Sequence, residues 1–364
     1  MSYGIGLAGY GGIGRLHALC WRMLPLVYPE LPTVRLAVVA AASEATRARA
    51  RRELGAEVAI LDDALLIATH TEVQIVDCCL PTDAHVALVT RALANGRAVF
   101  CEKPLTSDLL ATQQLAAQAA QMGVVASVNY HFRQVPALAE ARRRVQAGLL
   151  GEVRGFHLRY HRASNLNIHR PITWRFVGDG SGVLLDLGAH LVDQVLTLLG
   201  PVARVAARTR TVVRERPGVD GTLTAVSGDD IAWLDLELAD GGYGTISVSK
   251  MVPGANDDVR IEAYGARGAL LYDARDPNVI EIAENGGAMQ RITMLSRTPG
   301  AVLPAAETPT GAIQWHLASI AAFVASMQPD PPDRAPTFDE AARVDAVLAA
   351  AQQSVRAGGA WVDI

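Results

Sequence analysis

Short apolar runs alternate with longer amphipathic stretches along the first third of the chain. The apolar runs have the length of β-strands, and nearly every position within them is apolar. The predicted strands are Tyr3 to Ala8, Val34 to Ala40, Val58 to Leu61, Ile75 to Leu80, Ala98 to Cys101 and Val124 to Val128. The predicted helices are a first one that ends at Leu24, then Glu44 to Leu54, Ala84 to Asn95 and Leu109 to Met122. Apolar strands separated by helices predict a parallel sheet that is covered on both faces.

After Asn129 the pattern changes to strands that follow one another without helices between them. Several alternate apolar and polar residues, and Asp240-Gly241-Gly242 is a typical hairpin turn. The predicted strands are Val153 to Arg162, Val202 to Val213, Ala232 to Leu238, Tyr243 to Val252, Val259 to Tyr264 and Ala269 to Asp273. Two predicted helices, Ala137 to Ala147 and Val183 to Leu199, flank them. This pattern predicts an α+β domain with a large, mostly antiparallel, open sheet that packs one face on its own helices.

The last part of the chain returns to helices. Leu295 to Pro309 contains several prolines and is predicted to be irregular. Gln314 to Met327 and Asp339 to Ala357 are predicted helices, the second with a cap at Thr337-Phe338-Asp339-Glu340. We therefore expect an α/β protein of two domains, residues 1–128 and residues 129–364, with packing of the C-terminal helices back on the first domain as an alternative.

Composition and charge are those of a globular protein without a polyanionic partner. Of the 364 residues, 50% are hydrophobic and 19% are charged, and the net charge is -4. The densest basic group is Arg47, Arg49, Arg51 and Arg52 on one predicted helix, which indicates a solvated helix face rather than a nucleic-acid footprint. We expect no nucleic-acid partner.

The cysteines indicate a reducing compartment. Cys20, Cys78, Cys79 and Cys101 form neither a CxxC pair nor a zinc-type spacing, and we predict buried free thiols. The sequence shows neither a signal peptide nor an apolar stretch of the about 20 residues that a bilayer span requires. A cytoplasmic protein without membrane contact is expected.

A glycine-rich segment, Gly9-Tyr10-Gly11-Gly12-Ile13-Gly14, follows the first predicted strand and precedes the first helix. It fits G-x-G-x-x-G, whose glycines allow a tight turn, close approach of the backbone to a pyrophosphate and close helix–strand packing. The helix N-terminus would face the phosphates with free N–H groups and the positive end of its dipole. The pattern predicts a dinucleotide-binding Rossmann domain, with Gly9, Gly11, Gly12, Ile13 and Gly14 at the cofactor.

The end of the second predicted strand bears on the choice between NAD and NADP. It reads Ala40-Ala41-Ala42-Ser43, without the acidic residue that usually holds the ribose 2′-hydroxyl of NAD, and Glu44 follows one or two residues too late. Ser43 and Arg47 could bind a 2′-phosphate, which slightly favours NADP; the alternative is that Arg47 points to water. The expected cofactor is NAD or NADP.

Three further motifs occur in order along the chain. Leu80-Pro81-Thr82-Asp83-Ala84-His85 follows one buried predicted strand, Cys101-Glu102-Lys103-Pro104 follows the next, and Gly182-Val183-Leu184-Leu185-Asp186-Leu187-Gly188-Ala189-His190 opens a later helix. With the N-terminal glycines, they resemble the glucose–fructose oxidoreductase, inositol dehydrogenase and rhizopine-catabolism (Gfo/Idh/MocA) family over essentially the whole chain. The resemblance implies a Rossmann domain followed by a domain with a large open sheet, and activity on sugars, inositols or related polyols.

By this resemblance Lys103, Asp186 and His190 are the catalytic residues, and Thr82, His85, Glu102 and Lys103 line the nicotinamide side of the cofactor pocket. An imidazole such as that of His190 titrates near neutral pH and suits the removal of a hydroxyl proton. Asp186, four residues earlier, shares a helix face with it and could orient the imidazole or bind a substrate hydroxyl. The ammonium of Lys103 could polarise the reacting oxygen.

Each of these residues also has a structural interpretation. Asp186 could be a first-turn helix residue, His190 a packed histidine and Lys103 part of a loop. Their conjunction in the expected order favours catalysis. Asp193 is either a further partner of His190 or a solvent-facing acid.

Substrate contacts are predicted at the start of the second domain and in a polar loop. Tyr130 and Arg133 follow the last strand of the first domain. The loop supplies Asn165, His169, Trp174 and Arg175, with Trp174 either stacked on a sugar or packed under the loop. His157, His161 and His169 lack a supporting carboxylate pattern, so no metal is expected.

The sequence thus predicts an NAD(P)-dependent dehydrogenase for sugars or polyols. Two alternatives stay open: a redox-neutral enzyme that cleaves glycosides with bound NAD, and a non-catalytic sensor that binds a dinucleotide. Because an uncovered apolar sheet face would meet water, we expect a homodimer or homotetramer formed through the open sheet.

Overall fold

The computed structural model describes residues 2–294, 311–331 and 334–364. The chain divides into two compact units, Met1–Gln134 with Ser296–Ala342, and Val135–Leu295 with Arg343–Ile364. The segment from Leu295 to Pro309, for which an irregular structure is predicted, lies outside the described residues. No helix in the described part of the chain combines the length and the apolar character that a membrane span requires.

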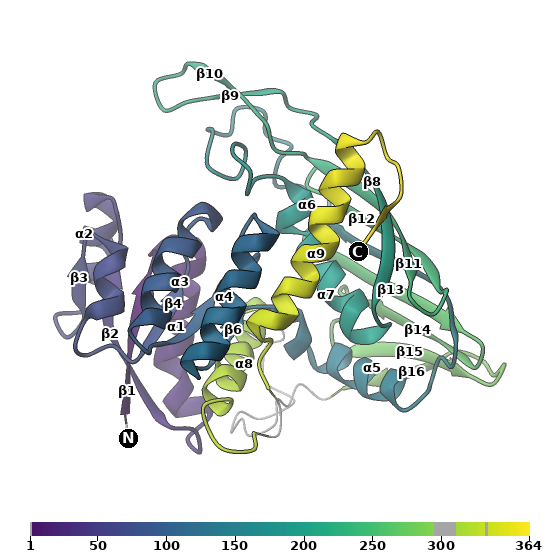
Figure 1. Cartoon of the computed structure of the whole chain (residues 1–364), viewed down its shortest axis with the longest axis horizontal. Coiled ribbons are helices and arrows are strands. Elements are labelled where there is room, and N and C mark those ends of the chain that lie inside the picture. Colours follow the sequence, from purple (N-terminus) through teal and green to yellow (C-terminus); the bar gives the residue numbers. More distant parts are fainter. Residues whose placement is uncertain (1, 295–310, 332–333) are drawn as a thin grey trace. The chain divides into compact units, whose positions relative to one another are not determined.

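Six parallel strands form the centre of the first unit, in the order β3-β2-β1-β4-β5-β6 (Figure 1). Their bounds are β1 (Ser2–Ala8), β2 (Thr33–Ala40), β3 (Ala59–Leu61), β4 (Ile75–Cys78), β5 (Ala98–Cys101) and β6 (Ala126–Val128). The strand order reverses between β1 and β4. In open parallel sheets ligands bind at this point, beyond the carboxyl ends of the strands.

Helices cover both faces of this sheet. They are α1 (Gly12–Val27), α2 (Glu44–Leu54), α3 (His85–Ala94), α4 (Leu109–Met122) and α8 (Ala312–Ala325), with the short 3-10 helices η1 (Ala64–Thr69), η2 (Thr82–Ala84) and η3 (His131–Gln134). α1 packs beside α8, and α3 packs beside α4. Right-handed crossovers place the first pair and the second pair on opposite faces. α1 runs one turn beyond its predicted end, through Pro25, because Leu24 and Val27 are buried in the core.

A nine-stranded sheet forms the second unit, in the order β16-β15-β14-β13-β7-β12-β11-β8-β17. The bounds are β7 (Val153–His161), β8 (Val202–Arg210), β11 (Ile231–Leu238), β12 (Tyr243–Ser249), β13 (Asp258–Gly265), β14 (Gly268–Asp273), β15 (Val279–Glu284), β16 (Gln290–Thr293) and β17 (Val362–Asp363). Only β7 and β12 pair in parallel among these neighbours. α5 (Pro136–Gln146), α6 (Val183–Asp186) and α7 (Gly188–Leu198) pack against the sheet.

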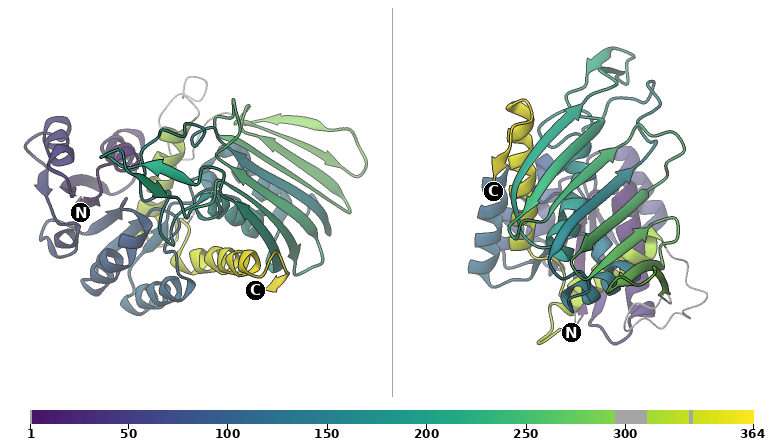
Figure 2. Two further views of the ribbon diagram at one scale, coloured as in Figure 1. Left: turned by 90° about the horizontal axis from the view of Figure 1, so that it is seen from above. Right: turned by 90° about the vertical axis from the view of Figure 1, so that its right-hand side faces the viewer.

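One face of this sheet is left open. In the right-hand view of Figure 2 the strands face the viewer with no helix of this unit in front of them, as far as the described residues go. Trp233, Tyr243 and Tyr264 on β11, β12 and β13 are 46–47% exposed. The predicted fold class, a parallel sheet followed by a mostly antiparallel open sheet, is confirmed.

Some elements differ from the prediction. The single helix predicted from Val183 to Leu199 is two helices, because the chain leaves the helical pattern at Leu187. β15, β16 and the hairpin of β9 (Glu215–Pro217) and β10 (Leu223–Ala225) were not predicted, although Val279–Glu284 contains three β-branched apolar residues. The predicted cap of α9 (Phe338–Arg356) is confirmed, since the Thr337 N–H donates to Glu340 Oε2 over 2.9 Å and the Glu340 N–H donates to Thr337 Oγ1 over 3.2 Å.

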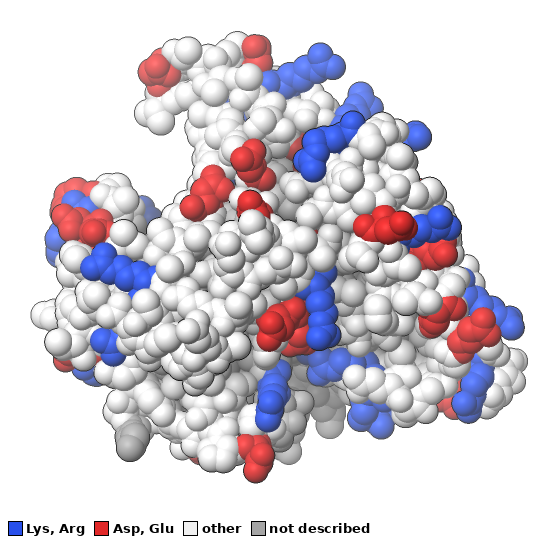
Figure 3. Space-filling model, viewed as in Figure 1, with Lys and Arg blue, Asp and Glu red and all other residues white. Residues whose placement is uncertain are grey.

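Charged side chains are mixed on the surface. On the face drawn in Figure 3, basic and acidic residues lie among one another rather than in one large patch of a single sign. This distribution agrees with the small net charge of -4.

Candidate active site

The glycine-rich turn joins β1 to α1 at the carboxyl edge of the six-stranded sheet. Gly9 has a φ of 94°, and a Cβ there would lie 2.6 Å from the carbonyl oxygen of Cys79. A Cβ on Gly14 would lie 1.9 Å from the carbonyl oxygen of Gly9. A Cβ on Gly11 or Gly12 would meet nothing within 4 Å. Packing therefore requires the first and last glycine, and the middle two leave an open surface.

This open surface fits the pyrophosphate of a dinucleotide. Gly11 is the N-cap residue of α1 and offers no side-chain hydrogen bond, and the first turn of the helix has no acidic residue. Its N–H groups and the positive end of its dipole thus lie beside a backbone that a ligand can approach closely. Ile13 is half-buried in the first turn. The residues present fit the predicted cofactor.

The residues after β2 are those expected to contact the ribose that distinguishes NAD from NADP. Ser43 accepts a hydrogen bond from the Thr46 N–H (3.2 Å) and caps α2. The Arg47 guanidinium donates to the carbonyl oxygens of Ala41 (2.9 Å) and Ala42 (2.6 Å) and pairs with Glu44 (2.9 Å). With its side chain only 17% exposed, Arg47 does not point to water, so that alternative is wrong. Hydrogen bonds from Arg51 and Arg47 lower the pKa of Glu44, which keeps a carboxylate at this edge.

The loops after β4 and β5 are tied together by His85. Its Nε2 lies 2.9 Å from the carbonyl oxygen of Leu80, and its Nδ1 lies 3.0 Å from that of Leu105. Thr82 is buried beside it, and Glu102 and Lys103 directly follow β5. The sequence-predicted cofactor residues of the first unit therefore come from the carboxyl ends of β1, β2, β4 and β5, and His85 supports the loops from within.

A buried chain of charges lies behind Lys103, and sequence reasoning missed most of it. His17 of α1 places Nδ1 3.0 Å from Asp77 Oδ2 and Nε2 3.2 Å from Glu102 Oε1. Asn129 donates from Nδ2 to Glu102 Oε1 (2.6 Å) and to His316 Nδ1 (2.9 Å). Because both nitrogens of His17 face carboxylates, the ring carries two N–H groups and a positive charge. An acid inside the apolar strand Ile75–Cys78 is the signal that could have revealed this network.

The electrostatics of this network agree with its geometry. Burial alone would lower the pKa of His17, but the Asp77 carboxylate raises it well above its ordinary value. Burial would raise the pKa of Glu102, but its hydrogen bond to His17 and the charge of His17 hold it well below the usual range. Burial and the charge of His17 lower the pKa of His316 to about 3. The network therefore contains one imidazolium, one neutral imidazole and two carboxylates.

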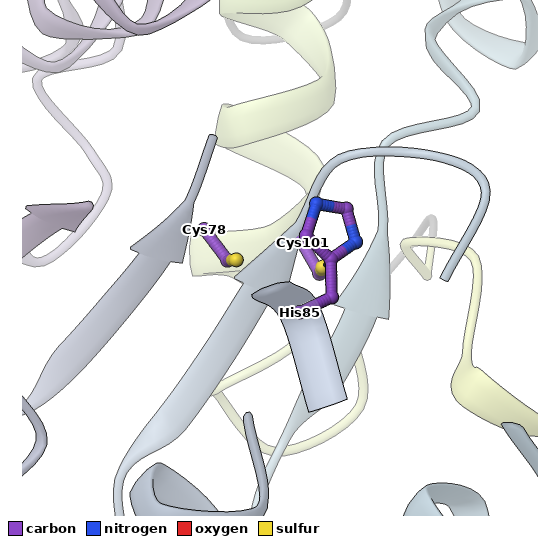
Figure 4. Close-up of side chains that lie close together, drawn as sticks. All are labelled: Cys78, His85 and Cys101. Carbon is purple, nitrogen blue, oxygen red and sulfur yellow. The ribbon is translucent and has the colours of Figure 1, made fainter. Parts of the chain in front are cut away.

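Cys78, His85 and Cys101 form a second buried group (Figure 4). The two cysteines are neighbours on β4 and β5, and Cys101 Sγ lies 3.4 Å from His85 Nδ1. Burial would raise the pKa of Cys78, but the hydrogen bond with Cys101 and the charge of His85 lower it to about 7. Both ring nitrogens of His85 already face carbonyl oxygens, so hydrogen bonding accounts for this group. The expectation that the protein binds no metal stays a prediction.

All four cysteines are free and buried, which confirms the predicted thiols.

The second unit brings Asp186 and Lys250 together. Asp186 is the last residue of α6, and His190 lies in the first turn of α7, so the break at Leu187 separates them. Lys250 directly follows β12 and donates from Nζ to Asp186 Oδ2. The side chain of Lys250 is 9% exposed and that of Asp186 is 30% exposed. The structure thus pairs a predicted catalytic acid with a lysine that the prediction did not include.

Lysine usage is the signal that could have revealed Lys250. Among the 33 basic residues Lys and Arg, only Lys103 and Lys250 are lysines. The other cationic positions carry arginine, which cannot give up its proton. Both lysines lie at the end of a strand. Lys103 follows β5 after one intervening residue, and Lys250 follows β12 directly.

Other polar residues gather near His190. Its ring centroid lies 6.2 Å from that of Tyr160, whose hydroxyl donates to Asp257 Oδ1 over 2.6 Å. Burial and the nearby carboxylates of Asp257 and Asp186 raise the pKa of Tyr160 well above its ordinary value. Asp193 is fully buried, so the solvent-facing interpretation of this residue is wrong.

Arg216 holds the predicted substrate loop through hydrogen bonds to its backbone. This buried guanidinium donates to the carbonyl oxygens of Asn167 (2.7 Å) and Asn165 (2.8 Å) and lies 4.2 Å from the centroid of the Phe176 ring. The Asn165 side chain is itself buried and donates to Asp230 Oδ1 over 2.9 Å. Asn165 therefore holds the loop in place.

The remaining candidate substrate residues fall into two groups. His169, Trp174 and Arg175 are exposed, and the Arg175 guanidinium lies 4.2 Å from the centroid of the Trp174 ring. Tyr130 is fully buried, and Arg133 is nearly so and pairs with Glu340 (2.5 Å). The exposed loop residues are available to a ligand, whereas Tyr130 and Arg133 are buried.

Comparison with known proteins identifies the family. Residues 3–130 match the model of an oxidoreductase family with an NAD-binding Rossmann fold, and residues 138–271 match the model of the GFO/IDH/MocA C-terminal domain. The chain belongs to the Gfo/Idh/MocA family of oxidoreductases. The resemblance seen in the sequence motifs is thereby confirmed, as is the NAD-binding character of the first unit.

Two curated relatives of this Gfo/Idh/MocA chain are named for their substrates. Levoglucosan dehydrogenase of Pseudarthrobacter phenanthrenivorans is 26% identical over 297 residues, which cover 77% of this chain and 75% of the relative. Inositol 2-dehydrogenase of Rhizobium meliloti is 28% identical over 289 residues, which cover 79% and 80%.

Solved structures show the same fold. An oxidoreductase domain protein from Kribbella flavida aligns with a TM-score of 0.91 and 29% identity over 100% of this chain and 99% of that one. Levoglucosan dehydrogenase in complex with NADH aligns with a TM-score of 0.92 over the same shares at 22% identity, a likeness of fold alone.

Proposed function

We propose that this chain is an NAD(H)-dependent dehydrogenase that interconverts a hydroxyl and a carbonyl group of a sugar, an inositol or a related polyol. One observation carries the proposal. The first unit has an open backbone surface at Gly11 and Gly12 that a dinucleotide can approach. The same chain also contains Lys103, Asp186 and His190 in the order of the family motifs. Binding of a dinucleotide alone does not require such a set of acids and bases.

Each of the three residues has a distinct role in this proposal. In the oxidation direction His190 takes the hydroxyl proton, because a neutral imidazole is a base near neutral pH. Lys103 donates to the reacting oxygen and stabilises the negative charge that develops there. Asp186 accepts a hydrogen bond from the imidazole or from a second substrate hydroxyl. In reduction the same groups return the proton to the carbonyl oxygen. When bound, the nicotinamide supplies the hydride acceptor for oxidation and the hydride donor for reduction.

We propose NAD(H) as the preferred cofactor, against the slight preference for NADP that the sequence suggested. Arg47 is engaged by Ala41, Ala42 and Glu44, so it is not available to a 2′-phosphate. The ionised Glu44 at the same edge would repel that phosphate. The complex of levoglucosan dehydrogenase with NADH, a protein of the same fold, supports this choice.

The substrate class is supported by the relatives and by the loop. Two relatives are named for levoglucosan and inositol, both rich in hydroxyl groups. His169, Trp174 and Arg175 offer an exposed aromatic face and polar groups, which suit a sugar ring.

The decisive experiment is a reduction assay with NAD and NADP in parallel against monosaccharides, anhydrosugars, glycosides and inositols. We expect turnover with NAD that falls at least about 100-fold in Lys103→Ala and in His190→Ala. The matched control is Arg35→Ala, which removes an exposed cation of the first unit and leaves turnover unchanged.

The outcomes separate this function from its alternatives. Cleavage of a glycoside without net reduction of NAD would identify the redox-neutral hydrolase. Tight dinucleotide binding without turnover of any compound would identify a sensor. Either result contradicts the dehydrogenase.

We further propose a homodimer or homotetramer formed through the open sheet. Trp233, Tyr243 and Tyr264 expose aromatic surface on one sheet face, and a second copy would remove it from water. Light scattering at micromolar concentration should give two or four times 38.6 kDa, and the mass of one chain would contradict this proposal.

We also propose that the protein is cytoplasmic and that its two parts bind the cofactor and the substrate separately. Four free, buried cysteines fit a reducing compartment. Residues 1–128 would bind the cofactor, and residues 129–364 would bind the substrate and the second copy. Cell fractionation tests the location.

A further inference from the structure

The use of lysine in this chain is highly selective. Only two of its 33 basic residues are lysines. Lys103 belongs to the family motif Glu102-Lys103-Pro104 and has a proposed role at the reacting oxygen, whereas Lys250 has no role so far. Lysine at such a position supplies more than a positive charge, since lysine and arginine side chains differ in size, hydration and proton affinity.

The surroundings of Lys250 place it among the acid–base residues of the second unit. It directly follows β12, and its side chain is 9% exposed. Its backbone is fixed on both sides, since its N–H donates to the Asp230 carbonyl over 3.0 Å and its carbonyl accepts from the Asn165 N–H over 3.0 Å. Its ammonium donates to Asp186 Oδ2. Because the backbone of Lys250 is fixed, its ammonium can keep the Asp186 carboxylate in one orientation.

Asp186 needs such a partner because of where it lies. It is the last residue of α6, and the junction with α7 follows at Leu187, so its side chain depends on contacts with other elements for its orientation. The described groups near its charge include Lys250 after β12 and Tyr160 on β7. Beyond Tyr160 lie the pair Asp257 and Arg162, and the His190 ring of α7 lies beside Tyr160. Lys250 is a cation in direct contact with Asp186.

We propose that Lys250 is a positioning residue of the reaction, whose ammonium keeps Asp186 ionised and oriented beside the helix that carries His190. The inference rests on the proposed dehydrogenase function. It assigns Asp186 as the acceptor of a hydrogen bond, because a carboxylate held by an ammonium has no proton to donate. The compact ammonium fits the enclosed position, whereas a guanidinium is wider.

Lys250→Met tests this role through a pH profile. Without the cation, Asp186 takes up a proton at higher pH, so the acid limb of kcat/KM should move up by about one pH unit. On this acid limb kcat/KM should fall by up to about 10-fold at a given pH and recover as the pH rises. A loss that is equal at every pH indicates a merely structural effect and overturns the proposal.

Two further variants keep the test independent of folding defects. Lys250→Arg restores a cation and should return the acid limb to its wild-type position, with kcat still reduced by the larger side chain. Asp186→Asn should make the second substitution Lys250→Met nearly silent, because Lys250 acts through Asp186. An acid limb that Lys250→Arg fails to restore, or losses that multiply in the double variant, would contradict the role.

A measurement without turnover separates this inference from the proposed function. Growth on lysine labelled with ¹³C at Cε gives an NMR spectrum of only two lysine side chains. Lys103→Ala and Lys250→Met assign the two signals. Asp186→Asn should shift the Lys250 signal, and the exposed substitution Glu72→Gln should leave it in place. If the Lys250 signal does not respond, the pairing is refuted, even when the dehydrogenase assay succeeds. If it responds while no polyol is turned over, the proposed function fails and the pairing stands.

Discussion

The two units of this protein hold their charged residues in different ways. In the first unit His17, Asp77 and Glu102 form a closed network in which the histidine and Asp77 side chains have no solvent exposure. In the second unit Asp186 pairs with Lys250 at a helix break and keeps 30% of its side chain exposed. A closed network rigidifies the loops that carry it, whereas a carboxylate with an open side can accept a hydrogen bond from a ligand. Burial therefore separates charges that support a site from charges that can act in it.

The strongest contrast within the first unit is between its glycines. Gly14→Ala would place a Cβ 1.9 Å from the Gly9 carbonyl oxygen, and we expect a loss of about 3 kcal/mol or more, or no folded protein. Gly11→Ala places its Cβ in open space and should fold normally, with NADH binding weakened about 10-fold. Thermal melts and NADH fluorescence test both. A stable Gly14→Ala protein would contradict the close packing of Gly14 against the Gly9 carbonyl.

The next test compares the closed network of the first unit with the partly open pair of the second. His17→Gln leaves Asp77 and Glu102 without their shared cation and should reduce the free energy of unfolding by about 3–5 kcal/mol. Lys250→Met, beside a partly exposed carboxylate, should cost about 1 kcal/mol. Urea denaturation measures both, and equal losses would break the distinction between the units.

The pH dependence of this loss has a definite sign. The pKa of His17 is raised in the folded state, so its contribution is complete below the ordinary histidine pKa and is lost as the pH rises through the raised value. Wild type should therefore lose stability at alkaline pH in a way that His17→Gln does not. Parallel alkaline profiles of the two proteins would argue against a charged His17.

Asp229 tests the start of the helix that ends at Asp186. It accepts from the Leu184 N–H over 3.0 Å, and burial raises its pKa to about 6. Because the folded pKa is raised, the stability that Asp229 contributes is complete below about pH 4 and is lost as the pH rises through 6. Asp229→Asn keeps an acceptor without the charge and should be more stable than wild type by about 1–2 kcal/mol at pH 7.5. At pH 4 the gain should vanish, and melting curves at both pH values check this.

The smallest effect is expected at the cofactor edge. Glu44→Gln removes the carboxylate that would face a 2′-phosphate, and kcat/KM with NADP should rise about 3- to 10-fold relative to NAD. Glu72→Gln, an exposed glutamate of the same unit, serves as the control. An unchanged ratio would mean that Glu44 does not take part in the choice of cofactor.

The candidate site of the first unit was largely predictable from the sequence, for a topological reason. In a parallel sheet every strand ends at the same edge, so residues that directly follow strands come together there. Gly9 and Lys103 could be placed in this way, and the resemblance to the family added Thr82 and Glu102. The partners of Glu102 could not, because His17 and His316 lie on helices whose register against each other depends on packing.

In the second unit the same reasoning reached less far. The family motif located Asp186 and His190, but the helix break at Leu187 and the pairing with Lys250 depend on the packing of α6 against β11 and β12. The two residues lie 64 positions apart in the chain, and no local pattern links them.

The sequence by itself therefore determined the fold class, the dinucleotide cradle and the order of the motifs, because these follow from periodicity and from residues adjacent to strand ends. Only the tertiary structure decided which charges are paired, which are buried and which stay open: His17 with Asp77, Arg47 with the end of β2, and Asp186 with Lys250. The physical reason is that the pairing of side chains depends on distances between elements far apart in the chain, and packing sets these distances only once the sheets have formed.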